Sequence, residues 1–398
     1  MDYQYIDADN HFYEAPDAFT RHGNERVKRF VQWWEQGKKK RILFGGEVIG
    51  GTPNPTFNPI AKPGAFHQTL KALEKGEVPE GPRYGELEPL NPAYMDRELR
   101  LKAMNEQNLE RMFIYPTIGY SVEHHLVDDW DMLYDLFHSY NTWVDDDWGF
   151  NHHDRIYSPP MIPMADVDRS VRELEWALER GARLITMTPG PWYGRSPADS
   201  YFDPFWQIAN DAEASVILHA YGGIPHAYQQ FYKQAWARPP VTNQAHTQML
   251  MGALLPFHRP VMDSMMAMVL GGLFGRFPNL KVASIEVGAA WVGYCLHELD
   301  HAGSNLVERR VQTFDGELVG YPSDVFKQHC FVAPFPEEDV EALAGLIGPD
   351  RVLFGSDWPH PEGTAMPGDF RKYVAGLPEA EQRLVMRDNA LSLVEPAG

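Results

Sequence analysis

Residues 352–363 read Val-Leu-Phe-Gly-Ser-Asp-Trp-Pro-His-Pro-Glu-Gly, an apolar run followed by a carboxylate and two prolines. The apolar run predicts a short buried strand. The prolines prevent the chain from continuing as a helix or as a central strand. Asp357 therefore stands where a buried strand ends.

The first apolar segment of the chain ends in a similar way. Residues 3–6 run directly into Asp-Ala-Asp-Asn-His at 7–11. On an extended chain, side chains separated by one residue point the same way, so Asp9 and His11 can converge on one atom. Together with Asp357, this arrangement predicts a metal held at the mouth of a barrel.

The composition limits the partners of the protein. The chain has 398 residues, of which 44% are hydrophobic, and this is enough for a large core. Its net charge of −20 argues against nucleic acid or an anionic membrane as a partner. Cys295 and Cys330 are the only cysteines, so we expect no disulfide framework and no cysteine-rich zinc site. With no signal-peptide pattern and no long apolar run, the sequence predicts a cytoplasmic protein.

Apolar runs alternate with segments of helical period along the chain. The helical segments include 166–180, with Asp166 at its start, and 337–347, with Gly348 after its end. Eight such runs favour a parallel α/β barrel over an open sheet. The runs lie at about residues 3–9, 111–116, 159–164, 183–188, 215–219, 281–286, 329–333 and 351–355.

Two connections are too long for simple loops between a strand and a helix. They are residues 12–100, after the first predicted strand, and 220–280, after the fifth. We interpret both as insertions, serving as a lid or a subunit contact, within one domain that spans residues 1–398. Their many aromatic and methionine side chains favour an apolar or aromatic small-molecule substrate. They also favour a homo-oligomer, a dimer or larger, because apolar loops are costly to leave in water.

Four side chains at predicted strand ends can act as metal ligands. His219 ends the fifth run and joins Asp9, His11 and Asp357. Any one of them alone has an ordinary structural explanation, as a cap, a turn residue or a core histidine. Four at the same end of one barrel favour a site. Carboxylates with imidazoles suit Zn²⁺ best, with Mn²⁺ or Fe²⁺ as alternatives.

Four sequence motifs resemble the amidohydrolase-related family of the amidohydrolase superfamily. They are IDADNHF at 6–12, SVILHA at 215–220, GGLFGRFPNLKVASIEVGAAW at 271–291 and VLFGSDWPHPEG at 352–363. That family includes aminocarboxymuconate semialdehyde decarboxylase and γ-resorcylate decarboxylase. The resemblance implies a distorted (β/α)₈ TIM barrel with one divalent metal, acting on small carboxylated or ring-derived substrates. The family's ligands carry over onto Asp9, His11, His219 and Asp357, and residues 183–189 lack the lysine of the binuclear members.

The chain departs from this resemblance at Glu286, which stands where the decarboxylases have a histidine. Glu286 can act as a general base near a metal-bound water, or it can contact a metal ligand and orient it without binding the metal itself. Asp357 is expected both to bind the metal and to move a proton. His360 either orients Asp357 or packs on Trp358. Weaker candidates for the substrate pocket are His226, Tyr228, His258, Trp291 and Tyr294.

Three functions are compatible with this pattern. The first is a mononuclear hydrolase, in which metal-activated water cleaves a C–C or C–N bond of a small aromatic or ring-cleavage compound and Glu286 or Asp357 is the base. The second is a non-oxidative decarboxylase, in which Asp357 protonates carbon. The third is a barrel that binds metal without catalysis. It is suggested by Glu286, which replaces the histidine that the decarboxylases have at this position.

Overall fold

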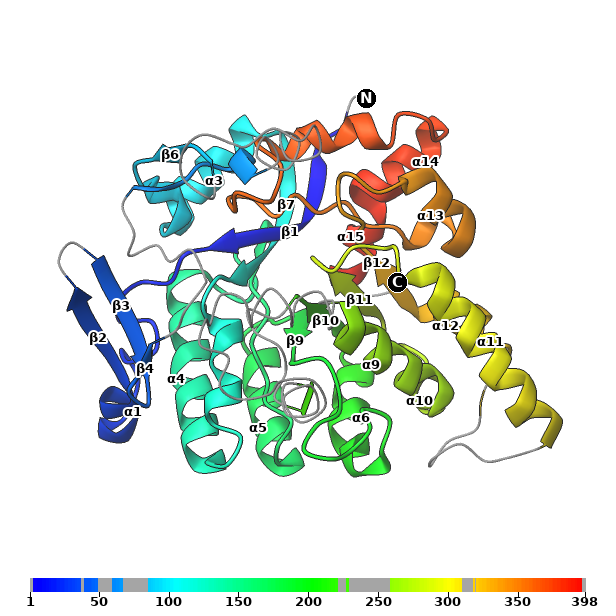
Figure 1. The fold of residues 1–398 in the computed structure, drawn as a ribbon, viewed down its shortest axis with the longest axis horizontal. Helices are drawn as coiled ribbons and strands as arrows, with labels where there is room; N and C mark the ends of the chain where they lie inside the picture. Colours follow the sequence, from blue (N-terminus) through cyan, green and yellow to red (C-terminus); the bar gives the residue numbers. More distant parts are fainter. Residues whose placement is uncertain are drawn as a thin grey trace, which may run out of the picture.

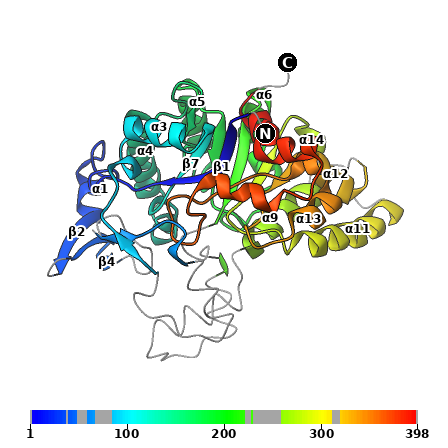
Figure 2. The same ribbon diagram turned by 90° about the horizontal axis from the view of Figure 1, so that it is seen from above.

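Parallel strands form the centre of the molecule. The computed structural model describes residues 3–36, 39–48, 59–66, 85–220, 227–228, 258–309, 318 and 320–395. Helices lie around the outside of the parallel strands (Figure 1, Figure 2). The strands are β1 (Tyr5–Phe12), β2 (Val31–Gln36), β3 (Lys39–Phe44), β4 (Glu47–Val48), β5 (Ile60–Ala61), β6 (Leu87–Glu88), β7 (Leu109–Pro116), β8 (Ile156–Tyr157), β9 (Leu184–Thr186), β10 (Ser215–His219), β11 (Val282–Ile285) and β12 (Cys330–Val332). The α-helices are α1 (Glu25–Phe30), α3 (Arg97–Glu106), α4 (Trp130–Asp147), α5 (Val167–Leu178), α6 (Asp203–Asp211), α9 (His258–Leu270), α10 (Leu273–Arg276), α11 (Val292–Arg309), α12 (Pro322–His329), α13 (Val340–Ile347), α14 (Glu379–Arg383) and α15 (Asn389–Val394).

The central strands pair in two parallel sheets. One sheet has the order β1-β7-β8 and the other the order β12-β11-β10-β9. A parallel bridge between Met161 and Thr186 connects the region after β8 with β9. The predicted parallel α/β arrangement is thus confirmed, with strand ends directed to one side. Two further parallel bridges join Val332 to Val352 and Asn10 to Trp358.

The predicted strand at 351–355 is replaced by a less regular segment. It makes single backbone hydrogen bonds to its two neighbours, Leu353 N to Val332 O at 2.9 Å and Ala8 N to Phe354 O at 2.9 Å. Close approach at Gly355 accompanies this irregularity, since a β-carbon added there would lie 2.7 Å from Asp9 Cβ. The segment still carries Asp357 to the end of β1.

Both predicted helices are present, with the predicted aspartate at the start of α5 and an aspartate that was not predicted at the start of α13. The side chain of Asp166 accepts a hydrogen bond from Arg169 N at the start of α5, and that of Asp339 does the same for Ala342 N at the start of α13. Such caps satisfy amide groups that have no partner within the helix. Both helices end within three residues of the predicted position.

The two long segments are described only in part. Within 12–100, the strands β2, β3 and β4 form an antiparallel sheet that lies beside α1, away from the parallel strands (Figure 1). Within 220–280, the described residues include α9 and α10. The role of these segments as insertions stays a prediction. Among the described residues, no helix is both long and apolar enough to cross a membrane.

Candidate metal centre

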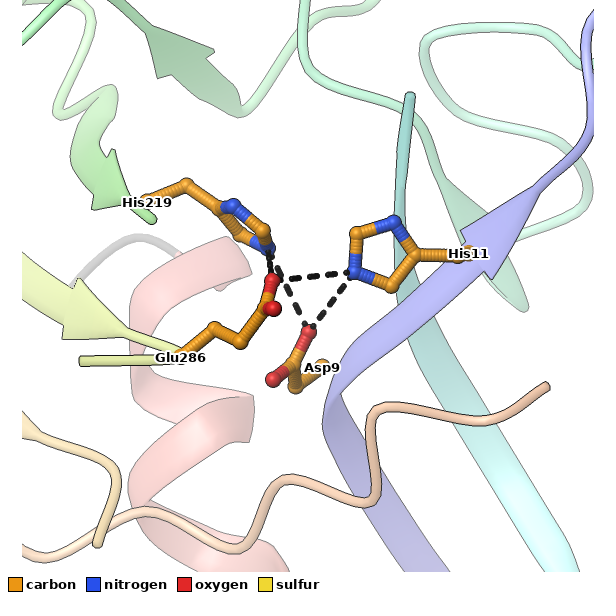
Figure 3. A group of neighbouring side chains, drawn as sticks. All are labelled: Asp9, His11, His219 and Glu286. Atoms are coloured by element: carbon orange, nitrogen blue, oxygen red, sulfur yellow. Dashed lines mark ion pairs between the residues drawn. The ribbon is translucent and has the colours of Figure 1, made fainter. Parts of the chain in front are cut away.

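Four side chains from three strand ends meet at one point. His11 Nε2 lies 3.4 Å from Asp9 Oδ1 and 3.5 Å from Glu286 Oε2. His219 Nε2 lies 3.4 Å from Asp9 Oδ1 and 3.2 Å from Glu286 Oε2. Figure 3 shows the two imidazoles and the two carboxylates directed toward one another. One potential ligand atom of each residue lies within 4.8 Å of all the others.

The backbone brings these side chains together. Asp9 and His11 belong to β1, His219 is the last residue of β10, and Glu286 follows β11. Glu286 has a φ of 57° and Asp357 a φ of 55°, in the left-handed region that residues with a side chain seldom adopt. Such conformations cost roughly 1–3 kcal/mol each and collect at functional sites. The strain at both carboxylates favours a function for their position.

Each imidazole of the group has its tautomer fixed by a backbone carbonyl. The Nδ1 atom of His11 lies 3.1 Å from Pro116 O, and that of His219 lies 2.7 Å from Ala220 O. A carbonyl can only accept, so Nδ1 carries the hydrogen in both neutral rings and Nε2 presents a lone pair. Within the described part of the chain, neither Nε2 atom nor Asp9 Oδ1 makes a hydrogen bond. Two imidazoles with carboxylates therefore fit a divalent cation.

The electrostatics of the centre also fit a cation. Burial opposes the charged form of His11, but the nearby carboxylates of Asp9 and Glu286 outweigh it and raise the pKa of His11 to about 10. Burial, followed by the charges of Glu286 and Asp9, holds the pKa of Asp357 well above its usual range. Carboxylates are thus crowded around the imidazoles, and a divalent ion would offset the excess negative charge.

Asp357 lies beside these four residues but does not belong to their set of mutually close ligand atoms. Its Oδ1 atom is 3.3 Å from His11 Nε2 and 2.8 Å from His360 Nδ1. It shares further sets of neighbouring ligand atoms with His11 and His360, and with Glu286, His360 and Glu362. The four mutually close ligands therefore include Glu286 where the sequence pattern led us to expect Asp357.

His360 is buried between two polar partners. Its Nδ1 faces Asp357, and its Nε2 lies 3.1 Å from Thr117 Oγ1. Burial, followed by the charge of His11, holds the pKa of His360 well below its usual value, which favours a neutral ring. Of the two interpretations of His360, the contact with Asp357 is the one that the structure displays.

A buried cation supports β1 from behind the metal centre. The guanidinium of Arg100 donates to His11 O at 2.7 Å, to Ala93 O at 2.7 Å and to the side chain of Asn10. It also lies over the ring of Trp358, 4.7 Å from its centroid. Arg100 escaped the sequence reasoning because a lone arginine in a helical segment normally marks an exposed face.

Asp7 connects β1 to the segment that carries Asp357. It accepts hydrogen bonds from Ser356 N at 2.9 Å and from Asn10 Nδ2 at 2.8 Å. Burial raises the pKa of Asp7 to about 7. Sequence reasoning also missed Glu362, although it is the second carboxylate of the DWPHPEG segment and its spacing from Asp357 was a usable signal.

The weaker candidates have the following surroundings. Trp291 is buried, and its Nε1 donates to Gly288 O at 2.8 Å. His258 opens α9 and is half-buried, and burial lowers its pKa. Tyr294 is 58% exposed. Among the described residues, His258 belongs to no group of potential metal ligands. His226 lies outside the described residues.

Comparison with known proteins shows the family to which this chain belongs. The sequence profile of the amidohydrolase family matches residues 6–395. A crystal structure of an amidohydrolase from Mycobacterium avium subsp. paratuberculosis is 36% identical, with a TM-score of 0.86 over 99% of this chain and 100% of that one. The chain belongs to the amidohydrolase family, as the motifs predicted.

More distant relatives carry more specific names. γ-Resorcylate decarboxylase from Polaromonas is 22% identical over 50% of this chain and 58% of its own length. The first two curated relatives are matched over 58% and 59% of their lengths. The manganese-bound structure of a 5-carboxyvanillate decarboxylase from Novosphingobium aromaticivorans is 15% identical, with a TM-score of 0.63 over 99% of this chain and 97% of that one. This likeness indicates a TIM-barrel-like fold.

These names correct one prediction. We expected hydrolysis by metal-activated water as the main reaction, but the three curated relatives are all decarboxylases. The prediction of a hydrolase was therefore wrong, and the alternative of decarboxylation is favoured. The misjudgement concerned Glu286, because we took a carboxylate in place of the histidine of the decarboxylases as a sign of a base for hydrolysis.

Proposed function

We propose that this protein is a divalent-metal-dependent decarboxylase of a small aromatic or ring-cleavage-derived carboxylic acid. The observation that carries the proposal is a buried carboxyl group, Asp357, placed against the ligand cluster. It is 3.3 Å from His11 Nε2 and has its own imidazole partner in His360. A decarboxylase needs an acid at this position, because the carbon that loses CO₂ must gain a proton.

The chain's residues divide into two roles. Asp9, His11, His219 and Glu286 would hold the cation, and Asp357 would be close enough to become a further ligand. When bound, the cation would bind the oxygens of the substrate and stabilise negative charge on them. Asp357 gives its proton to the carbon as the bond to the carboxylate breaks, so that R–COO⁻ and H⁺ become R–H and CO₂. A proton from solvent then restores Asp357.

We propose one cation, either Zn²⁺ or Mn²⁺. Imidazole and carboxylate ligands suit both ions, so the donor set does not choose between them. Manganese in the 5-carboxyvanillate decarboxylase supports Mn²⁺. Titration of the metal-free protein with each ion, followed by activity measurements on each loaded form, distinguishes them.

We also propose that the parallel strands form a closed barrel. The bridges from β12 through Val352 and from Trp358 to β1 support closure of the two sheets into one distorted (β/α)₈ barrel. We also propose a single domain that forms a homo-oligomer, which light scattering of the purified chain will test.

Isotope labelling separates decarboxylation from hydrolysis. The metal-loaded protein is incubated in D₂O, and separately in H₂¹⁸O, with 2,6-dihydroxybenzoate, 5-carboxyvanillate and related ring acids. We expect the product of an accepted acid to contain one deuterium at the carbon that lost CO₂ and no ¹⁸O. An organic product that retains all carbons and gains ¹⁸O would contradict the proposal.

A further inference from the structure

The end of β7 orients two imidazoles of the site in succession. Pro116 O accepts from Nδ1 of His11 at 3.1 Å, and the next residue, Thr117, lies 3.1 Å from Nε2 of His360. The rings of His11 and His360 pack against each other with centroids 4.0 Å apart. Neither β7 nor Thr117 provides a potential metal ligand among the described residues, yet together they contact the rings of His11 and His360.

The direction of the hydrogen bonds at Thr117 follows from its partners. Thr117 Oγ1 lies 2.8 Å from Phe12 O, which can only accept, so the single hydroxyl hydrogen points to that carbonyl. The hydroxyl therefore has only lone pairs left for His360. The contact at Nε2 is then a hydrogen bond that His360 donates.

We propose that Thr117 is a positioning residue, whose hydroxyl fixes His360 in the tautomer with hydrogen on Nε2. The Nδ1 atom of the neutral ring then presents a lone pair to Asp357 Oδ1, 2.8 Å away. Thr117 thus fixes the orientation of the ring against which Asp357, the acid of the proposed reaction, is held.

Three variants test this role. Thr117→Val keeps the shape of the side chain and removes the hydroxyl, whereas Thr117→Ser keeps the hydroxyl. The matched control is Thr364→Val, because Thr364 is also buried and its Oγ1 makes no hydrogen bond within the described part. Unfolding midpoints and metal content of all variants establish that the fold and the cation site are intact.

The first readout is nitrogen NMR of ¹⁵N-histidine-labelled protein, metal-free and loaded with Zn²⁺, with the His360 signals assigned through a His360→Asn variant. We expect hydrogen on Nε2 of His360 in the wild type and in Thr117→Ser, and a mixture of tautomers in Thr117→Val. A wild-type ring with hydrogen on Nδ1, or no change in Thr117→Val, would overturn the inference.

The second readout depends on the proposed function. Removal of an orienting partner typically costs about 10–100-fold in activity. We expect Thr117→Val to lose that much in kcat with KM within about threefold, and Thr117→Ser to recover most of it. Thr364→Val should keep kcat within about twofold. If the wild type decarboxylates no acid, the proposed function fails, while the NMR result still decides the role of Thr117. Unchanged kcat in Thr117→Val would contradict that role.

Discussion

The two sides of the metal centre are built differently. On the β1 side, Asp9 and His11 are almost completely buried, and Arg100 and Asp7 hold the surrounding backbone through several hydrogen bonds. On the β11 side, Glu286 has a side chain that is 20% exposed and a left-handed backbone. From this difference we predict that the β1 side would hold a cation in a fixed geometry, whereas Glu286 on the β11 side is freer to move.

The largest effect on stability is expected from removing the support of β1. Arg100→Met leaves His11 O, Ala93 O and the Asn10 amide oxygen without their buried donor. At about 1–3 kcal/mol for each unsatisfied group, we expect the free energy of unfolding to fall by roughly 3–5 kcal/mol in denaturant titration. The control is Arg383→Met, which breaks an exposed ion pair with Asp388 and should cost at most about 1 kcal/mol. Equal losses in both variants would show that Arg100 gives β1 no special support.

The second prediction compares one carboxylate from each side. Asp9→Asn and Glu286→Gln make the same change of carboxylate to amide. We expect Asp9→Asn to weaken cation binding by at least about 100-fold and Glu286→Gln by about 10-fold, because only Asp9 is held by a fixed strand. Calorimetric titration of metal-free protein with Zn²⁺ and Mn²⁺ measures both values. A larger loss in Glu286→Gln would reverse the assignment of the rigid side.

A smaller effect is expected where the 352–358 segment passes β1. In Gly355→Ala the new β-carbon would lie 2.7 Å from Asp9 Cβ, so one strand end has to move. Overpacking of this kind costs about 1–3 kcal/mol. Gly345→Ala is the control, because its β-carbon would meet nothing within 4 Å in α13 and should stabilise by about 0.5–1 kcal/mol. Thermal unfolding distinguishes the two, and a stable Gly355→Ala would show that Asp9 is free to move.

The smallest effect is a pH dependence just beyond β1. Burial raises the pKa of Glu14 from 4.5 to about 7, although it accepts hydrogen bonds from Ile118 N and Gly119 N. Between pH 4.5 and 7 the folded state therefore keeps a proton that the unfolded state has lost, so this group makes stability fall as pH rises. Glu14→Gln should flatten the slope of unfolding free energy in that window. Parallel slopes for the two proteins would show that Glu14 is ionised in the fold.

The sequence predicted those parts of the site that depend on local pattern. Asp9 and His11 were recognisable from a spacing of one residue on a strand, and His219 from its place at the end of an apolar run. The parallel strands and the cap at Asp166 follow from similar short-range rules. Membership of the amidohydrolase family followed from motifs that keep these positions together.

Other parts of the site could not be predicted because they depend on the chain far away. Arg100 reaches His11 O across 89 residues, and Thr117 reaches His360 across 243. Glu286 was expected near the metal but not among its ligands, and no pattern in the sequence signals the left-handed backbone that accompanies its place in the ligand group. The choice between acid and base at Asp357 likewise depends on burial and on carboxylates from other strands.

Release of labelled carbon dioxide is the most direct test of metal-dependent decarboxylation. The protein is prepared free of metal, divided, and one part is loaded with Mn²⁺ or Zn²⁺ before addition of ring acids labelled with ¹³C in the carboxyl group. We expect one equivalent of ¹³CO₂ for each product molecule from the loaded protein. We expect almost none from the metal-free protein or from Asp357→Asn. Turnover that leaves the ¹³C label in the organic product, or equal release without metal, would contradict metal-dependent decarboxylation.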